Sequence, residues 1–190
     1  MVRVARDDGK VAGECILLRR MRGHAFTGGE TQHTRFHAEA QALRPHLQDA
    51  PYDEQKAALQ ARLFGDSDFY SRGFLAAGFA ADDLVVNCEP LQRRWAREAG
   101  ASALGLEVAV EQIRRAKPDV LYLQDLGMAT QPFLAAVRPH VGLIVGQNAC
   151  PTPPTAHLPG FDVLFTSFPH FVDRYRQTGV AAYYQPLSFE

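Results

Sequence analysis

The sequence predicts an α/β protein with a Rossmann-like, doubly wound and mostly parallel sheet that carries helices on both faces. Three short apolar runs each pass directly into polar residues, and runs of this kind are typical of strands buried on both faces. Segments with helical patterns separate the runs, which favours a parallel sheet with right-handed crossovers. The runs are 120–123, followed by Gln124 and Asp125; 141–145, followed by Gln147 and Asn148; and 162–165, followed by Ser167 and His170.

The first fifty residues hold one predicted core strand, the apolar run 15–18. Residues 1–14 are expected to form an extension or a hairpin, because Asp7, Asp8 and Gly9 make a turn signal. Residues 21–50 contain several glycines and have weak periodicity, which is typical of a long loop or insert.

Helices are predicted where helix-forming residues lie between capping and terminating signals. Asp66 or Ser67 can cap a helix over 68–77, and Gly78 follows it. Pro90 opens another helix that Gly100 ends, which is the usual placement of proline and glycine at helix ends. The remaining predicted elements are helices at 53–64, 90–99, 106–116, 131–137 and 171–177, and strands at 84–86 and 181–184.

Composition and charge narrow the class of protein. The chain has 190 residues, 46% of them hydrophobic and 22% charged, which fits one globular domain spanning 1–190. A formal net charge of -1 gives no support for binding nucleic acid. No apolar run is long enough for a membrane span and the N-terminus lacks a signal-peptide core, so we expect a cytoplasmic protein without a transmembrane segment. Cys15, Cys88 and Cys150 form no CxxC pair, so we expect reduced thiols rather than a zinc site or a disulfide framework.

The residues after the predicted strands are the candidate site, because ligands of such sheets bind beyond the carboxyl ends of the strands. Asp125 could accept a proton from a hydroxyl as a general base, or it could cap the following loop or helix. Gln147 and Asn148 offer amide groups suited to the hydroxyl groups of a ligand, although both could serve loop hydrogen bonds instead. Gln124 is expected to line the same edge.

His170 stands at the start of a predicted helix beside this edge. Imidazole is suited to proton transfer near neutral pH, so His170 is a candidate base; the alternative is that it caps the helix or bonds a backbone carbonyl. Ser167 could contact a substrate or act as the helix N-cap.

Two further features have a structural and a functional interpretation. His33 and His37 are four residues apart and could hold a metal on a helix, but the pattern is not HExxH, so no metal site is predicted. Trp95 follows Leu91 at helical spacing and is expected in the core, with Arg93, Arg94 and Arg97 on the solvated side of that helix.

Five segments together resemble the amino-terminal half of two-domain, GT-B-type glycosyltransferases, in the bacterial group related to spore-maturation glycosyltransferases. The similarity covers roughly residues 52–190, and the order and spacing of the segments carry it. They are Leu-Phe-Gly-Asp-Ser-Asp-Phe-Tyr-Ser at 63–71, Asn-Cys-Glu-Pro-Leu-Gln at 87–92 with Trp95 and Ala96, Lys-Pro-Asp-Val-Leu-Tyr-Leu-Gln-Asp at 117–125, Gly146-Gln147 with Cys150-Pro151, and Thr-Ser-Phe-Pro-His-Phe-Val at 166–172.

The resemblance implies that this chain binds the acceptor, a sugar or another hydroxyl compound. A carboxyl-terminal domain that binds the nucleotide-sugar donor would be the partner, and it is absent from this chain. No cofactor or metal is implied beyond that donor, and the isolated chain is expected to be inactive. The resemblance makes Asp125 and His170 the catalytic candidates, and the acceptor-binding candidates are Gln124, Gln147, Asn148 and Ser167.

The alternative is a stand-alone binding or regulatory module that keeps the sheet for a partner or for self-association. Neither GxGxxG nor GxxxxGK[ST] occurs, which argues against a self-sufficient dinucleotide or ATP site. A small hydrolase is disfavoured because no GxSxG motif is present.

Overall fold

The structure is a computed structural model, and it describes residues 47, 49–61, 68–86, 88–152, 154 and 156–186, together with the backbone of residues 14–19. The predicted extension before residue 14 and nearly all of the insert 21–50 lie outside these residues, so both remain predictions. His33 and His37 lie there too.

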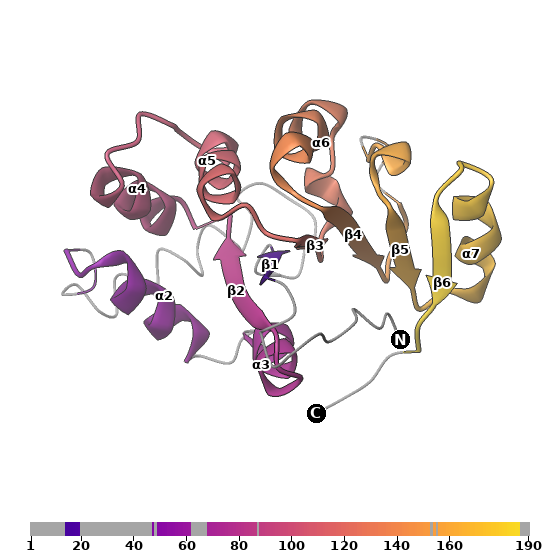
Figure 1. The fold of residues 1–190 in the computed structure, drawn as a ribbon, viewed down its shortest axis with the longest axis horizontal. Helices are drawn as coiled ribbons and strands as arrows, with labels where there is room; N and C mark the ends of the chain where they lie inside the picture. Colours follow the sequence, from indigo (N-terminus) through magenta and orange to yellow (C-terminus); the bar gives the residue numbers. More distant parts are fainter. Residues whose placement is uncertain are drawn as a thin grey trace, which may run out of the picture. The chain divides into compact units, whose positions relative to one another are not determined.

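Within the described residues six strands form one sheet in the order β2-β1-β3-β4-β5-β6 (Figure 1). The four neighbouring pairs from β1 to β6 are parallel, which confirms the predicted α/β fold with a parallel sheet. The strands are β1 (Glu14–Arg19), β2 (Ala80–Val85), β3 (Val120–Leu123), β4 (Leu143–Asn148), β5 (Val163–Thr166) and β6 (Ala181–Tyr184).

The strand order contains a switch of direction between β1 and β3. From β1 the chain goes to β2 at one edge of the sheet and then returns to β3 on the other side of β1. In open parallel sheets such a point leaves a crevice outside the carboxyl ends of the two strands, where ligands bind. Gln124 and Asp125 follow β3 on one side of this point.

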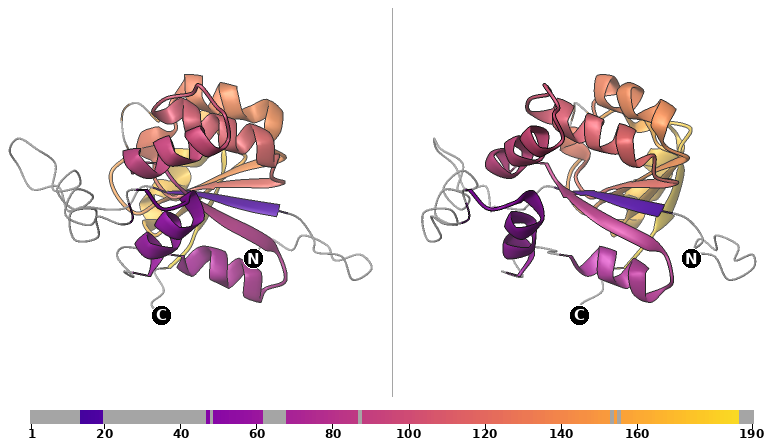
Figure 2. Two further views of the ribbon diagram at one scale, coloured as in Figure 1. Left: turned by 90° about the vertical axis from the view of Figure 1, so that its left-hand side faces the viewer. Right: turned by 60° about the vertical axis from the view of Figure 1, so that its left-hand side comes forward.

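Helices lie on both faces of the sheet, as predicted. Figures 1 and 2 show α3 (Phe69–Ala76) on one face and α6 (Gln131–Val137) on the other. The ring of Phe74 in α3 contacts the ring of Tyr122 in β3, with centroids 6.5 Å apart. On β5 and β6 packs α7 (Pro169–Arg176), whose Tyr175 is fully buried.

The outer strands leave an open apolar face, which we define by Leu143, Phe165 and Tyr183. The register places these residues of β4, β5 and β6 on the same side of the sheet as Tyr122. Leu143 is 40% and Tyr183 50% exposed, and the rings of Phe165 and Tyr183 contact each other at 6.1 Å. On the opposite side of these strands Ile144, Leu164 and Ala182 are buried, whereas Tyr184 at the end of β6 is 53% exposed.

The described residues form two compact units, which we describe separately. One holds the sheet, and the other includes α2 (Tyr52–Gln60), α4 (Glu89–Glu98) and the first half of α5 (Leu106–Ala116). The core of this second unit contains Tyr52, Leu59, Val85, Cys88 and Leu91, and Trp95 packs against it, which confirms the predicted core position of Trp95.

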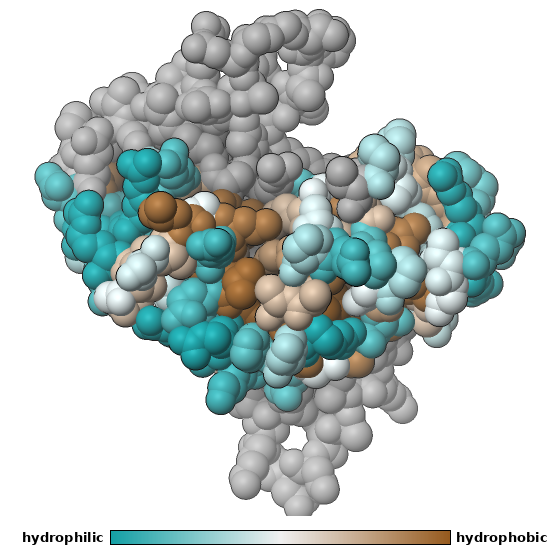
Figure 3. Space-filling model, turned by 90° about the horizontal axis from the view of Figure 1, so that it is seen from above, coloured by the Kyte–Doolittle hydropathy of each residue, from teal (hydrophilic) through white to brown (hydrophobic). Residues whose placement is uncertain are grey.

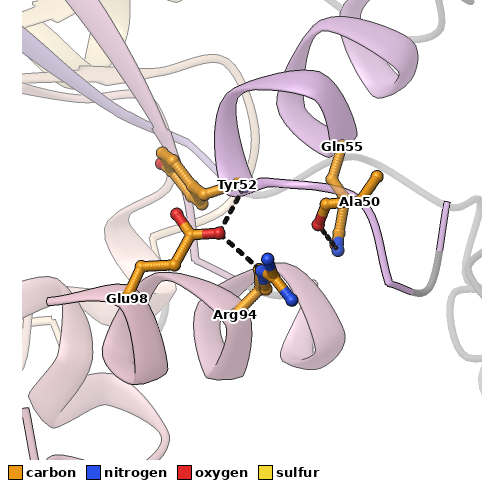
Figure 4. Close-up of polar contacts among 5 residues, drawn as sticks. All are labelled: Ala50, Tyr52, Gln55, Arg94 and Glu98. Atoms are coloured by element: carbon orange, nitrogen blue, oxygen red, sulfur yellow. Dashed lines mark hydrogen bonds and ion pairs between the residues drawn. The ribbon is translucent and has the colours of Figure 1, made fainter. Parts of the chain in front are cut away.

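Glu98 joins α2 to α4 in this second unit (Figure 4). The first backbone N–H groups of a helix have no partner within it, and Pro51 at the N-cap of α2 supplies no side-chain acceptor. Glu98 fills that role, because its Oε1 accepts the backbone N–H of Tyr52 at 3.1 Å and also the Nε–H of Arg94 at 2.5 Å. The side chain of Gln55 bonds the carbonyl of Ala50 beside this contact, at 2.9 Å.

We expect protonation of Glu98 to loosen the attachment of α2 to α4. The hydrogen bond from Arg94, with a smaller contribution from the Tyr52 N–H, holds the pKa of Glu98 below its ordinary value. Because the pKa is lower in the folded chain, this contact stabilises the fold above the ordinary pKa of glutamate, and its contribution is lost as the pH falls through the lowered value. Hydrogen-exchange protection factors of α2 should therefore fall on acidification. In Glu98→Gln the protection factors of α2 should be low at every pH. The control is Glu89→Gln, which removes an exposed ion pair with Arg93 and should behave as the wild type. Full protection of α2 in Glu98→Gln would contradict the proposed role of Glu98.

Candidate functional site

The structure brings the polar residues at the carboxyl ends of β3, β4 and β5 to one edge of the sheet. These strands are parallel neighbours, so their carboxyl ends point the same way. Adjacent strands lie about 4.8 Å apart, so the residues after β3 and β5 are separated by roughly 10 Å, within reach of one small ligand. The structure therefore places all six predicted site residues along one carboxyl edge.

Gln124 and Gln147 stand at the same level of this edge. Leu123 pairs with Gly146, so the next residue on each strand is a glutamine. Gln147 Oε1 accepts a hydrogen bond from the Tyr122 hydroxyl at 2.6 Å, which fixes the orientation of its amide. Gln124 Nε2 is buried and has no acceptor among the described residues. A buried donor without an acceptor is unfavourable, so this group is suited to receive an oxygen of a ligand.

Asp125 caps the turn that follows β3, which is one of the two roles that the sequence left open. Its Oδ1 accepts the backbone N–H of Gly127 at 2.7 Å, at the start of the 3-10 turn η2 (Leu126–Met128). The cap holds the carboxylate in one orientation at the end of β3. A fixed carboxylate remains compatible with proton acceptance from a bound hydroxyl.

Asn148 is committed to the protein interior. It is 3% exposed, and its Nδ2 donates to the carbonyl of Cys150 at 2.7 Å and to the hydroxyl of Tyr175 at 2.6 Å. The Tyr175 hydroxyl also bonds the hydroxyl of Thr152 at 2.8 Å. Asn148 therefore has the loop-bonding role left open by the sequence, and it holds the turn after β4 against α7.

His170 is exposed on the first turn of α7, beside two aromatic rings. The ring centroid of His170 lies 5.6 Å from that of Phe168 and 4.5 Å from that of Phe171. Ser167 is half-buried and does not cap the helix, because the N-cap position falls on Phe168, whose N–H is bonded by the Thr166 hydroxyl at 3.1 Å. An exposed imidazole with flanking rings can accept a proton from a ligand and contact its apolar face.

Sequence reasoning missed Tyr122 and Tyr175. Both tyrosines lie in apolar patterns that predict only core positions. Their hydroxyls nevertheless orient Gln147 and Asn148. The available signal was that a buried tyrosine hydroxyl needs a hydrogen-bond partner, and the nearest polar side chains at a strand end are the natural candidates.

The exposed thiol of Cys150 gives a chemical reporter for this edge. Cys150 is exposed, whereas Cys88 is buried, and burial raises the pKa of the Cys88 thiol to about 11. The thiolate is the reactive form, so at about pH 8 only roughly 0.1% of Cys88 would be reactive even with access. We expect iodoacetamide to modify Cys150 and spare Cys88 in the folded chain, as measured by peptide mass spectrometry. Unfolding in urea should abolish the difference between the two cysteines. Equal modification of Cys88 and Cys150 without urea would contradict the burial of Cys88.

No protein-family model, curated protein or solved structure matches the chain. In the part of the chain that the structure describes, no helix is long and apolar enough to cross a membrane. The same residues contain no group of three or more histidine, cysteine, aspartate or glutamate side chains placed to hold a metal ion.

Proposed function

We propose that this chain is the acceptor-binding domain of a two-domain glycosyltransferase, which transfers a sugar from a nucleotide-sugar to a hydroxyl acceptor. The proposal depends on Gln124 Nε2, a donor without an acceptor among the described residues, which lies beside Gln147 at the carboxyl ends of two neighbouring strands. A hydroxyl group both donates and accepts hydrogen bonds, so a sugar ring suits such an edge.

The proposed reaction assigns separate roles to the edge residues. Gln124, Gln147 and Ser167 bind and orient the acceptor. Asp125 or His170 takes the proton of its hydroxyl as the oxygen attacks the anomeric carbon of the donor, and the nucleotide leaves with the bonding electron pair. The donor would be held by a companion domain, so catalysis depends on alignment of two bound substrates in one cleft.

Calorimetry with two ligand classes tests this proposal. Nucleotide-sugars should give no binding to the chain alone, and micromolar affinity for one of them would contradict the division of roles. One or more simple methyl glycosides should bind with a Kd on the order of 1 mM, the range for a ligand of about a dozen heavy atoms. Gln124→Ala should abolish that binding and Gln177→Ala, at an exposed position after α7, should not. Absence of glycoside binding across the panel would contradict the acceptor role.

A binding module is the second candidate, and the open apolar face favours it. Phe165 and Tyr183 pair on neighbouring strands and their rings contact each other, so they form a partly exposed apolar patch, whereas Leu143 lies towards the other end of β4. Exposed apolar surface marks interaction sites, so a partner or a second copy could cover this patch. The coding sequence beyond Glu190 discriminates the two candidates: a further Rossmann-like segment favours the transferase, and a stop codon favours the module.

A further inference from the structure

The second compact unit contains a pocket that the proposed acceptor site does not use. It has a volume of about 490 Å³, within the range of small-molecule sites. Its walls come from α4, from the turn 101–105 and from the start of α5. The lining residues are Val86, Glu89, Gln92, Arg93, Ala96, Arg97, Val108 and the five residues Ala101 to Gly105.

The local sequence builds this hollow from one helix stripe and a fixed turn. The residues of α4 in the lining recur every three or four positions, at 89, at 92 and 93, and at 96 and 97, which places them on one side of the helix. After α4, Gly100 adopts a φ of 62°, and the N–H groups of Gly100 and Ala101 bond the carbonyls of Arg97 and Ala96. This is a Schellman turn, which folds the chain back sharply. Small residues on the turn, among them Ala103, leave the space unfilled.

The pocket presents one guanidinium, that of Arg97, for which the described residues supply no acidic partner. Arg93 forms an ion pair with Glu89, and Arg94 bonds Glu98 on the side of α2. Arg97 forms no ion pair with any described residue. The sequence predicted all three arginines on a solvated surface, but the structure separates them by role. Guanidinium binds carboxylate through two parallel hydrogen bonds, so Arg97 favours an anionic group.

Gln92 adds a buried acceptor to the lining. It is 3% exposed, and its Nε2 donates to the carbonyl of Val85 at 2.8 Å. A carbonyl can only accept, so the amide nitrogen must face Val85 and Oε1 faces away from it. Oε1 is buried and has no donor among the described residues. A ligand with an N–H or O–H group would supply the missing donor.

The mouth of the pocket carries exposed apolar surface. Leu104 lines the pocket and is 71% exposed, which is unusual for a large aliphatic side chain. Figure 3 shows apolar surface, in brown, bordered by hydrophilic residues, in teal, on the face seen from above Figure 1. An apolar ligand body placed against Leu104 would remove this surface from water.

We propose that this pocket binds a small organic carboxylate with an apolar body and an N–H or O–H donor. The carboxylate pairs with Arg97, the donor bonds Gln92 Oε1, and the apolar body contacts Leu104 and Val108. The site is composed of other residues than the carboxyl edge and does not depend on the proposed transferase function.

N-acetyl-L-leucine is a suitable probe because it combines the three features, and N-acetyl-L-leucinamide is its neutral counterpart. In nitrogen-15 NMR titrations of the whole chain, the first should shift the backbone amides of residues 96–108 with a Kd on the order of 1 mM. The second should bind about tenfold more weakly, because the charge-assisted hydrogen bonds are lost.

Variants separate the role of Arg97 from that of its neighbours. Arg97→Gln should weaken binding of N-acetyl-L-leucine about tenfold, and Arg93→Gln less than about threefold, because Arg93 is already paired. Arg115→Gln, on α5 outside the pocket, should bind as the wild type. Retained binding in Arg97→Gln, equal binding of the two probes, or the absence of shifts at 96–108 would each overturn the proposal. The comparison of the two probes on the wild-type chain does not depend on how any variant folds.

Discussion

Leu121→Ala should lower the free energy of unfolding by about 3 kcal/mol, the middle of the range for aliphatic residues cut to alanine in a core. Leu121 is fully buried in β3, between β1 and β4 near the middle of the sheet. The substitution removes apolar contacts and leaves a cavity that the paired strands cannot close. Since domains are typically stable by only about 5–15 kcal/mol, the loss would be a large share of the total.

Leu143→Ala is the matched control for this prediction. Leu143 lies in the neighbouring strand β4 but is 40% exposed on the open apolar face, so we expect a loss below about 1 kcal/mol. Urea unfolding of both variants, followed by circular dichroism, measures the difference. Equal losses of unfolding free energy in the two variants would show that the open apolar face is covered in solution, for example by self-association. Dilution would then dissociate the copies and restore the difference.

Tyr175→Phe should cost about 1–3 kcal/mol, although it removes only one oxygen atom. The hydroxyl bonds Asn148 Nδ2 and the Thr152 hydroxyl inside the protein, and both lose a partner in the variant. The Asn148 amide keeps its bond to the Cys150 carbonyl but loses the Tyr175 hydroxyl as an acceptor, and a buried N–H that loses its acceptor bears a desolvation cost. The effect should be concentrated in the turn after β4, where the exchange of the Cys150 amide should accelerate.

A double-mutant cycle isolates this contact. Tyr175→Phe and Asn148→Ala should be coupled by about 0.5–3 kcal/mol, because both substitutions remove the same hydrogen bond between Asn148 Nδ2 and the Tyr175 hydroxyl. Tyr184→Phe alters an exposed tyrosine of β6 and should stay within about 0.5 kcal/mol of the wild type. Strict additivity of the coupled pair would mean that the hydrogen bond does not form in solution.

The apolar runs predicted the strands well where burial alone decides them, as in β3 and β5. The apolar runs did not predict the strand ends correctly where pairing with a neighbouring strand or a hydrogen bond to a distant residue decides them. Strand β4 continues to Asn148 because its pairing with β5 continues there. Strand β2 begins at Ala80 and includes Asp83, a residue type disfavoured in strands. Asp83 is tolerated because the Ser71 hydroxyl of α3 bonds its carboxylate, a partner that the local sequence does not reveal.

Dependence on distant partners also restricted what could be predicted of the candidate site. Strand ends indicate which residues reach the carboxyl edge, but not which side of the sheet each one faces. Side chains alternate along a strand, so Gln147 and Asn148 face opposite sides and have different roles. The predicted strand ends at residue 145, and its extension over residues 146–148, which decides the side that each residue faces, depends on pairing with β5. The pocket beside α4 could not be predicted, because it depends on the path of the turn after Gly100.

Nitrogen-15 NMR mapping of a methyl glycoside that binds the chain tests the central claim most directly. We expect chemical-shift changes confined to the carboxyl edge, at the amides of residues 124–127, 147–148 and 166–171. These changes should be lost in Gln124→Ala. Shifts confined to the amino ends of the same strands, at residues 117–119 and 141–142, or to residues 96–108 beside α4, would contradict it.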